Sequence, residues 1–533
     1  MAHVVNNMEN RPNFLFIITD QHRADHLGCY GNSVLKTPHI DSLATRGIRY
    51  DRFYVANPVC QPNRASLMTG RMPSVHGVRN NGIPLSRDHV TFVELLASAG
   101  YWTGLMGKSH LQNMTGRLSP LNFKTIEGKS APPEDLREAN RRPLTGPAYD
   151  NENARLWSNP KHDVRLPFYG FKEARICTGH GDMVGGDYQR WLEEKQPGAS
   201  ALAGVDNALS DQRRMAPQAW RTSLPENLYP TSYVKELSCE FIERQAANRD
   251  NPFFLQVSFP DPHHPFTPPG KYWDLYDPDD ILLSSSFYEG ELAPLRWLRE
   301  ELATGTADRE GPLKPFAVTA EEAKSIIALT YGMIAMVDDA IGEILSVLDL
   351  TGQSENTVVI FTADHGDFMG EHGIMLKYML HYQGLVRVPC IIYDPTLKSA
   401  GGVCENLTGT IDLAPTILSM AGLQPFNGMQ GRNLNDNEVP PRSAIVIEED
   451  SAIPQFDNNE VDRVRTMVTD RWRLTYHHCG NWWELYDLKA DPDENANLWE
   501  GADRPAVAEE LVQIMLSQLV ELNDTSPFPT GRA

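Results

Sequence analysis

Basic residues are scarce in this sequence of 533 residues. Lysine and arginine together number 48, against 70 aspartate and glutamate residues, and the formal net charge is −22. A chain this acidic repels both the phosphate backbone of nucleic acids and anionic lipid surfaces. The charge balance therefore argues against nucleic-acid-binding and basic membrane-associated proteins, and we expect neither a nucleic acid nor a membrane as a partner.

Long hydrophobic runs are also absent. The first twenty residues lack a basic start, and their apolar stretch, Phe14–Ile18, is much shorter than the hydrophobic segment of a signal peptide. The longest uncharged, apolar-rich run, Ser325–Val337, is followed by Asp338 and is too short to cross a bilayer. These absences argue against a secreted or membrane-spanning protein and predict a cytoplasmic one.

Cysteine is sparse and follows no pairing pattern. The seven cysteines are odd in number and show no C-x-x-C spacing; they are Cys29, Cys60, Cys177, Cys239, Cys390, Cys404 and Cys479. Such a set argues against a disulfide framework or a cysteine-based zinc ribbon, and it fits a reducing cytosol. Hydrophobic residues nevertheless make up 41% of the chain, which is enough for a large packed core and excludes disorder as the main state.

Three short apolar runs stand out, each followed by polar residues: Asn13–Thr19, Pro252–Phe259 and Thr357–Thr362. Near-continuous hydrophobicity is typical of strands buried on both faces, as in a parallel sheet. Thr319–Leu348 is predicted to be a helix, because Thr319 and Glu322 have capping-box spacing and its apolar residues form one stripe. The alternation of strands and helices along the chain predicts a doubly wound α/β core, in which ligands gather at the carboxyl ends of the strands.

The character of the sequence changes twice along the chain. Residues 112–250 are rich in proline, glycine, arginine and asparagine, and we interpret them as a loop-rich lid within an α/β catalytic domain that spans 1–440. Residues 441–533 are predicted to form a smaller antiparallel α+β subdomain. Its expected elements are the strands Ser443–Ile447, Val464–Thr469 and Trp472–Tyr476, the last two as a hairpin, and the helix Pro505–Leu522.

The most informative segment begins at Cys60. It reads C-Q-P-N-R-A-S-L-M-T-G and resembles the signature of the sulfatase family, C-x-P-x-R followed by A-S-L-x-T-G. The resemblance implies that a formylglycine-generating enzyme oxidises Cys60 to formylglycine after translation. It also implies an alkaline-phosphatase-like fold, in which helices flank a large mixed, mostly parallel sheet.

The residues of this segment suit an anion. Pro62 and the run after it favour a helix start, so Cys60 is expected at a helix N-terminus, where free N–H groups and the helix dipole attract negative charge. Arg64, one turn later, is expected to pair with the oxygen of the nucleophile or with a bound sulfate. A hydrated aldehyde at position 60 would supply an oxygen nucleophile and an exit route for the transferred group.

Two dipeptides at predicted strand ends suggest a metal site. Asp20-Gln21 follows the first strand and Asp364-His365 follows a late one. Two carboxylates, an amide oxygen and an imidazole, together with the nucleophile derived from Cys60, suit one hard divalent cation, Ca²⁺ or Mn²⁺, with Mg²⁺ also compatible. The Asp-Gln and Asp-His pairs are most similar to those of phosphonate monoester hydrolases and related cytosolic sulfatases.

Further residues match the family's order of motifs. Lys108 and His110 resemble its G-K-x-H motif, and His263 resembles the histidine of its P-H-x-P motif. Lys377 stands where the family has a lysine that contacts substrate, and Asn81 resembles a polar residue that faces the transferred group. The segment from Glu484 to Leu498 resembles the closing motif of the C-terminal subdomain.

The resemblance implies a role for each of these residues. The metal and Arg64 hold the nucleophile at position 60, and Lys108 and Lys377 offset charge on the sulfate oxygens. His263, alone or together with Lys377, protonates the leaving alcohol or phenol, and His110 removes a proton from the remaining hydroxyl so that sulfate departs.

We therefore expect a hydrolase of small-molecule sulfate esters, with aryl sulfates as substrates and a homo-oligomer as one possible assembly. A phosphonate monoester or phosphodiester hydrolase on the same site is the alternative, favoured by the Asp-Gln and Asp-His pairs. Lys108 and His110 favour sulfate, because phosphonate monoester hydrolases are expected to have residues similar to Tyr and Thr at these two positions. A non-catalytic metal-binding protein is a third, remote interpretation, and it predicts an unmodified Cys60.

Overall fold

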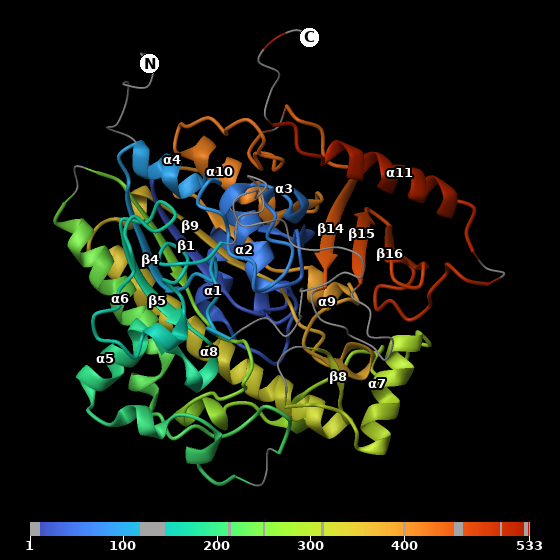
Figure 1. Cartoon of the computed structure of the whole chain (residues 1–533), viewed down its shortest axis with the longest axis horizontal. Coiled ribbons are helices and arrows are strands. Elements are labelled where there is room, and N and C mark those ends of the chain that lie inside the picture. Colours follow the sequence, from blue (N-terminus) through green and yellow to red (C-terminus); the bar gives the residue numbers. More distant parts are fainter. Residues whose placement is uncertain are drawn as a thin grey trace, which may run out of the picture.

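The computed structural model describes residues 11–117, 144–211, 215–248, 251–310, 314–397, 401–436, 438–451, 462–501, 504–526 and 531. Figure 1 shows a main body with helices around a central sheet, and a second, smaller sheet beside it near the C-terminus. All seven cysteines are free thiols. Within the described part of the chain, no helix combines the length and the apolar character needed to cross a membrane.

The central sheet has nine strands in the order β12-β2-β11-β9-β1-β7-β4-β5-β6. Its middle is parallel and consists of β9 (Thr357–Ala363), β1 (Asn13–Thr19), β7 (Phe253–Ser258), β4 (Trp102–Lys108) and β5 (Glu173–Thr178). Two strands run antiparallel to their neighbours, namely β11 (Cys390–Tyr393) and β6 (Gly185–Gly186). β2 (Ile48–Tyr50) and β12 (Gly402–Cys404) complete one edge. The predicted mixed, mostly parallel sheet is confirmed.

Helices cover both faces of this sheet, because the strands are apolar on both faces. In β1, Phe14 and Phe16 join one buried cluster, whereas Leu15 and Ile17 join the other, as the period of two in a strand requires. The first cluster includes side chains of α2 (Cys60–Thr69), α4 (Phe92–Ser98) and α10 (Leu413–Met420). The second includes side chains of α1 (Pro38–Arg46), α5 (Asp187–Lys195), α6 (Pro230–Ala246) and α8 (Ala320–Leu350).

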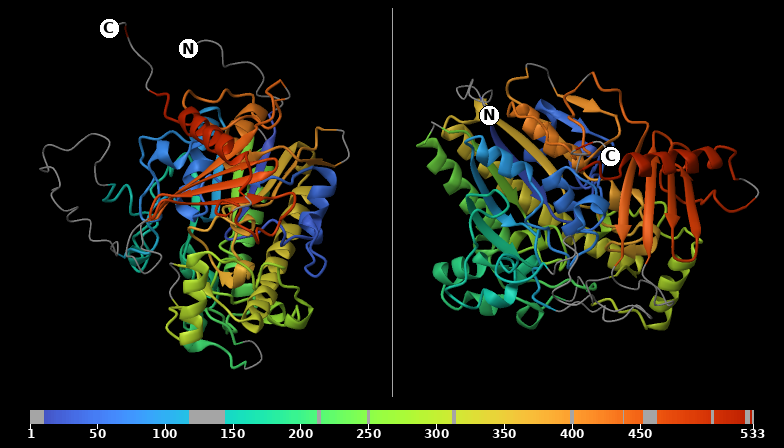
Figure 2. Two further views of the ribbon diagram at one scale, coloured as in Figure 1. Left: turned by 90° about the vertical axis from the view of Figure 1, so that its right-hand side faces the viewer. Right: turned by 45° about the horizontal axis from the view of Figure 1, so that its top comes forward.

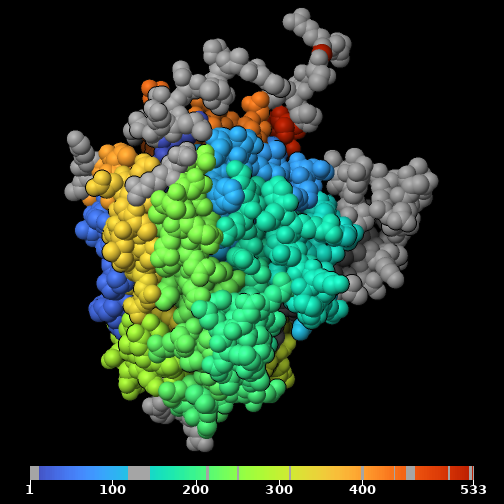
Figure 3. Space-filling view, turned by 90° about the vertical axis from the view of Figure 1, so that its left-hand side faces the viewer, coloured from blue at the N-terminus to red at the C-terminus, as the bar shows by residue number. Residues whose placement is uncertain are grey.

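The long helix α8 forms as the sequence predicts. Thr319 is its N-cap, and the side chains of Thr319 and Glu322 each accept a hydrogen bond from the other's backbone N–H. α6 packs against α8. Figure 3 shows the face of the molecule where the green atoms of the α6 region lie between blue-green and yellow segments.

Residues 112–250 contain more regular structure than the sequence suggests. β5 extends the central sheet beside β4, and α6 contributes Phe241 and Ile242 to the core. These elements were missed because β5 alternates buried and exposed positions at its start and because the polar residues of α6 blur its periodicity. Residues 118–143 of this predicted lid lie outside the described residues.

The C-terminal part of the chain forms a separate antiparallel sheet, β14-β15-β16-β17. Its strands are β14 (Ala444–Asp450), β15 (Arg463–Thr469), β16 (Trp472–His477) and β17 (Trp482–Asp487). α11 (Ala508–Glu521) packs on it through Leu511 and Met515, and the right-hand view of Figure 2 shows this helix beside the four strands. The hairpin and the helix are confirmed, whereas β17 was not predicted.

The remaining elements are short. They are α3 (Pro73–His76), α7 (Ala293–Thr304) and α9 (Gln383–Val386), with the strand pairs β3 (Phe53–Tyr54) and β13 (Thr408–Gly409), and β8 (Phe316–Ala317) and β10 (Ile374–Met375).

Candidate active site

The candidate residues gather at the carboxyl edge of the parallel strands. Asp20 and Gln21 follow β1, and Asp364 and His365 follow β9. Because Thr19 pairs with Ala363 at the ends of these two strands, the two dipeptides leave the sheet side by side. Lys108 ends β4, and His263 lies just beyond β7. The topology thus brings together residues that are distant in the sequence.

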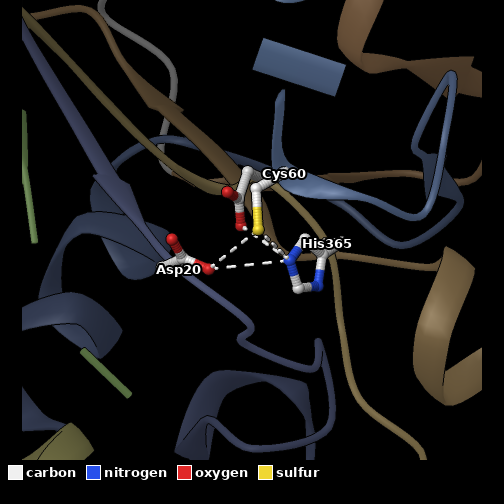
Figure 4. A group of neighbouring side chains, drawn as sticks. Asp20, Cys60 and His365 are labelled. Carbon is white, nitrogen blue, oxygen red and sulfur yellow. Dashed lines mark hydrogen bonds and ion pairs between the residues drawn. The ribbon is translucent and has the colours of Figure 1, made fainter. Parts of the chain in front are cut away.

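Cys60 is the first residue of α2, as predicted. Val59 is in an extended conformation, and its backbone N–H donates to the side chain of Asn57, so the chain turns into the helix at residue 60. The Cys60 thiol is buried, with Sγ 2.9 Å from Nε2 of His365 and 3.6 Å from Oδ1 of Asp20 (Figure 4). The positive end of the helix dipole at this helix start favours negative charge beside Sγ.

A cluster of potential metal ligands surrounds the thiol. One ligand atom from each of Asp20, Cys60, Asp364 and His365 can be chosen so that all four lie within 4.8 Å of one another. Gln21, in a left-handed conformation with φ 59°, donates from Nε2 to Asp367 at 2.6 Å. Oε1 of Gln21 accepts from Nζ of Lys377 at 3.3 Å, and it is the atom that this amide offers to a cation. Carboxylate, amide and imidazole donors fit a hard divalent cation.

Arg64 supports the carboxylates of this cluster. Its Nε donates to Oδ2 of Asp364 at 2.7 Å, and Nη2 lies 3.5 Å from Oδ2 of Asp20. Nη1 donates to the carbonyl of Lys108 and to the hydroxyl of Ser258, both at 2.9 Å. In the structure the guanidinium binds the proposed metal ligands, and the bond from Arg64 to the nucleophile or to sulfate stays a prediction.

Two lysines bring positive charge to the thiol. Nζ of Lys377 lies 3.2 Å from Sγ of Cys60 and 3.1 Å from Nε2 of His365. Nζ of Lys108 donates to Oδ2 of Asp20. Both lysine side chains are buried, so little solvent screens their charge.

These charges change the protonation of their neighbours. Burial opposes a thiolate, but Lys108 and Lys377 favour it enough to place the pKa of the Cys60 thiol below its ordinary value. Burial would raise the pKa of Asp20, yet the charges of Lys108 and Arg64 hold it well below its usual range. The site therefore favours negative charge both on Asp20 and at position 60.

The two neighbouring histidines make different contacts. Nδ1 of His263 lies 2.6 Å from the carbonyl oxygen of His264, and its Nε2 lies 2.9 Å from Nζ of Lys377. Nδ1 of His264 lies 3.1 Å from Nε2 of Gln21. Burial lowers the pKa of both rings well below the ordinary value. His263 therefore belongs to the lysine side of the site and His264 to the Gln21 side.

His110 and Asn81 are placed less directly. His110 has φ 54°, and its backbone N–H donates to the buried carboxylate of Glu152. Burial, with the charges of Lys108 and Arg64, lowers the pKa of His110 well below its usual value. No hydrogen bond joins its ring to Cys60 within the described ranges.

Asn81 accepts the N–H of Gln61 at 3.1 Å. Its side-chain oxygen therefore binds the first turn of α2, and the position of Asn81 beside the transferred group stays a prediction.

His180 is a residue of the site that the sequence analysis missed. Its Nε2 lies 2.6 Å from Nζ of Lys108 and 3.8 Å from Oδ2 of Asp20. Its ring stacks on that of His263, with centroids 3.6 Å apart and an interplanar angle of 10°. His180 follows the end of β5, and a polar residue after a parallel strand is a candidate for the site. The sequence analysis missed it because residues 112–250 were interpreted as loops.

Comparisons with known protein families and proteins identify the family of this chain. The sulfatase family matches residues 12–423, and the C-terminal family of N-sulphoglucosamine sulphohydrolase matches residues 370–523. An arylsulfatase of Clostridium perfringens is 29% identical over 520 residues, which cover 96% of this chain and 94% of that protein.

Solved structures are also similar to this chain over nearly its whole length. The phosphonate monoester hydrolase of Agrobacterium radiobacter is 25% identical with a TM-score of 0.73, covering 97% of each chain. A protein solved with its substrate D-glucosamine-2-N,6-O-disulfate is 22% identical, with a TM-score of 0.69 over 98% of this chain and all of that one, and shares the fold. The family match, which spans most of the chain, shows that this protein belongs to the sulfatase family, in the alkaline-phosphatase-like superfamily, and is a sulfuric ester hydrolase.

Proposed function

We propose that the protein hydrolyses aryl sulfates, with formylglycine derived from Cys60 and one divalent cation. The observation that carries the proposal is the position of Cys60, at a helix start and within 3.6 Å of Asp20, His365 and Lys377. When present, a hydrated formylglycine supplies an oxygen nucleophile, and the cation supplies electrostatic stabilisation of negative charge. Asp20, Gln21, Asp364 and His365 would hold the cation.

The side chains of the chain itself then have distinct tasks. Lys108 and Lys377 offset the charge on the non-bridging oxygens of the ester, which is usually the largest single contribution to such catalysis. Arg64 keeps Asp20 and Asp364 in place through its hydrogen bond and ion pair. His110, which is neutral at ordinary pH because of its lowered pKa, is available to accept a proton at the end of the cycle.

Lys377 and His263 serve the leaving group in this proposal. They lie 2.9 Å apart, and a departing phenol or alcohol that enters between them can take a proton from the ammonium. The stack of His180 on His263 limits the rotation of the His263 ring. The acid side of the site is thus ordered before substrate binds.

Phosphonate monoester or phosphodiester hydrolysis is the second candidate. The Asp20-Gln21 and Asp364-His365 pairs and the structural likeness to a phosphonate monoester hydrolase favour it. Lys108 and His110 favour sulfate esters. We also propose, from the sequence alone, a cytoplasmic location, a formylglycine-generating enzyme as a partner and a homo-oligomeric assembly.

Two measurements test the proposal. The mass of the peptide that bears residue 60, taken from the native host, should be that of the aldehyde or its hydrate, whereas thiol alone would contradict the nucleophile and favour a non-catalytic metal-binding protein. A panel of aryl sulfate, alkyl sulfate, aryl phosphonate and phosphodiester substrates, on enzyme of defined metal content, should give the highest kcat/KM for aryl sulfate. Faster turnover of the phosphonate would establish the second candidate instead, and Cys60→Ala is the blank for every substrate.

A further inference from the structure

Lys377 lies in a segment of unusual backbone conformation. The segment 376–383, which we name the Lys377 strap, joins β10 to α9. Leu376, Tyr378 and Met379 have φ values of 73°, 94° and 63°. Each is an L-residue in the left-handed region, which such residues rarely adopt because it is sterically strained. The strap therefore persists only because surrounding groups hold it.

Carboxylates hold the backbone of the strap from both sides. Oδ1 of Asp367, within the main body, accepts the N–H of Leu376 at 3.0 Å. On the other side of Lys377, Oε2 of Glu449 accepts the N–H of Met379 at 2.9 Å. Glu449 belongs to β14, in the four-stranded sheet. The lysine thus lies between two backbone groups, one held by a carboxylate of the main body and the other by a carboxylate of the four-stranded sheet.

Glu449 is itself fixed by the four-stranded sheet. Its Oε2 also lies 3.1 Å from Nε2 of His381, and Nδ1 of His381 lies 2.8 Å from the hydroxyl of Thr466 in β15. Thr466 in turn contacts the hydroxyl of Thr475 in β16 at 2.8 Å. A hydrogen-bonded chain therefore runs from three strands of this sheet to the backbone of the strap.

The position of the Lys377 ammonium depends on this backbone. Nζ lies within 3.2 Å of Sγ of Cys60 and of the ring nitrogens of His263 and His365, so a small shift of the strap would break all three contacts. The side chain of Glu449 is 1% exposed, and its Oε1 has no hydrogen-bond partner among the described residues. Both contacts of its Oε2, to the N–H of Met379 and to the ring of His381, are therefore contacts to the strap.

We propose that Glu449 is a positioning residue, through which the C-terminal sheet holds Lys377 in its catalytic place. The inference rests on the proposed function for the role of Lys377, but the arrangement of the strap can be tested without turnover. It gives the four-stranded sheet a part in the reaction beyond stability.

The chain offers a matched control in Asp462. This carboxylate is 2% exposed, lies 3.1 Å from Nδ1 of His477 and accepts the N–H of Cys479 at 2.8 Å. It also accepts the N–H of Arg463 at 2.7 Å, so it combines a histidine with backbone N–H groups, as Glu449 does. All three partners belong to the C-terminal sheet or its turn, and none is in the strap.

The experiment compares Glu449→Gln with Asp462→Asn on active enzyme, with nitrophenyl sulfate as substrate. Glu449→Gln should lower kcat/KM about 10- to 100-fold, the usual effect of losing a group that orients a catalytic residue. Asp462→Asn should leave it within about threefold of wild type. In a Lys377→Ala background, Glu449→Gln should cause no further loss, because the residue that it positions is gone.

Hydrogen–deuterium exchange provides a readout independent of activity. The peptide that contains 376–383 should exchange faster in Glu449→Gln than in wild type, and at the wild-type rate in Asp462→Asn. Thr466→Val, which removes the hydroxyl that holds His381, should change exchange and kcat/KM in the same direction with a smaller amplitude, and it serves if Glu449→Gln is unstable.

Either of two results would overturn the proposal. The first is wild-type exchange of the strap in folded Glu449→Gln. The second is a kcat/KM loss that adds fully to that of Lys377→Ala, which would mean that Glu449 acts on substrate directly. Inactive wild-type enzyme on every ester would refute the proposed function, and the exchange comparison would still decide whether Glu449 holds the strap.

Discussion

Nζ of Lys377 lies 2.9 Å from Nε2 of His263. The other ring nitrogen of His263, Nδ1, faces the carbonyl oxygen of His264 at 2.6 Å, so Nδ1 carries the ring proton and Nε2 accepts from the ammonium. Burial, with the charges of neighbouring groups, keeps the pKa of His263 well below its ordinary value, and the ring is neutral. In the free protein the transferable proton is therefore on Lys377, with His263 as the group that orients it.

His263→Ala should affect substrates according to their leaving groups. An alkyl alcohol or unactivated phenol needs a proton to depart, and general-acid assistance is worth about 10²–10⁴-fold. Because His263 orients the Lys377 ammonium and does not carry the proton itself, kcat/KM for these sulfates should fall about 10- to 100-fold. Nitrophenyl sulfate, whose phenolate leaves readily, should lose far less. Lys377→Ala should show the same dependence in addition to a loss common to all substrates.

The control is His264→Ala. His264 contacts Gln21 and not Lys377, so its loss should be modest and equal on activated and unactivated esters. An equal loss on both classes for His263→Ala would instead assign that residue to sulfate binding, and a larger effect at His264 would reverse the assignment of the two histidines.

Cys60→Ala should remove turnover without unfolding the protein. The side chain is buried but small, so we expect a loss of at least about 10⁴-fold in kcat with an unchanged circular dichroism spectrum. Cys60→Ser should stall as well, since one hydroxyl cannot both attack sulfur and later expel the group. Retention of more than a few per cent of the activity in Cys60→Ala would remove residue 60 from the mechanism.

Arg64→Lys should weaken metal binding although it preserves the charge. A lysine cannot donate at once to Asp364, Ser258 and the Lys108 carbonyl as the guanidinium does. We expect metal affinity, measured by calorimetry, to fall about 10- to 100-fold.

Arg442→Lys is the comparison for this variant. Arg442 binds the single carboxylate of Asp412 through two nitrogens and lies outside the cluster, so the metal affinity of Arg442→Lys should match that of wild type. Unchanged affinity in Arg64→Lys would show that the guanidinium does not organise the ligands.

Removal of divalent cations should abolish activity reversibly and lower the melting temperature. A cation held at about 100 times its Kd stabilises the folded state by about 2.7 kcal/mol, and Ca²⁺ or Mn²⁺ should restore both properties after chelation. In Asp364→Asn, addition or removal of the cation should change the melting temperature and the activity much less than in wild type.

A second group, His39, Asp338 and Asp339, has ligand atoms close enough to bind a cation, so Asp339→Asn is the necessary control. If Asp339→Asn loses the thermal response and Asp364→Asn retains it, the stabilising cation is not at the proposed active site.

Much of the core could be predicted from the sequence, because buried parallel strands have a clear local signature. Asn13–Thr19 is a strand with the predicted bounds, and the helix predicted from Thr319 begins at its cap. The polar residues directly after the apolar runs, Asp20 and Asp364 among them, could be placed at one edge of the sheet for the same reason. Cys60 at the start of α2 follows from the residues next to it.

Only the tertiary structure decided the partners of these side chains. Arg64 turns to Asp20 and Asp364, and His180 joins Lys108 from a segment that was interpreted as loops. Glu449 reaches the Lys377 strap from the other sheet. A local pattern reports how a residue is buried within its own strand or helix; which charge lies opposite depends on segments that fold together from distant parts of the chain.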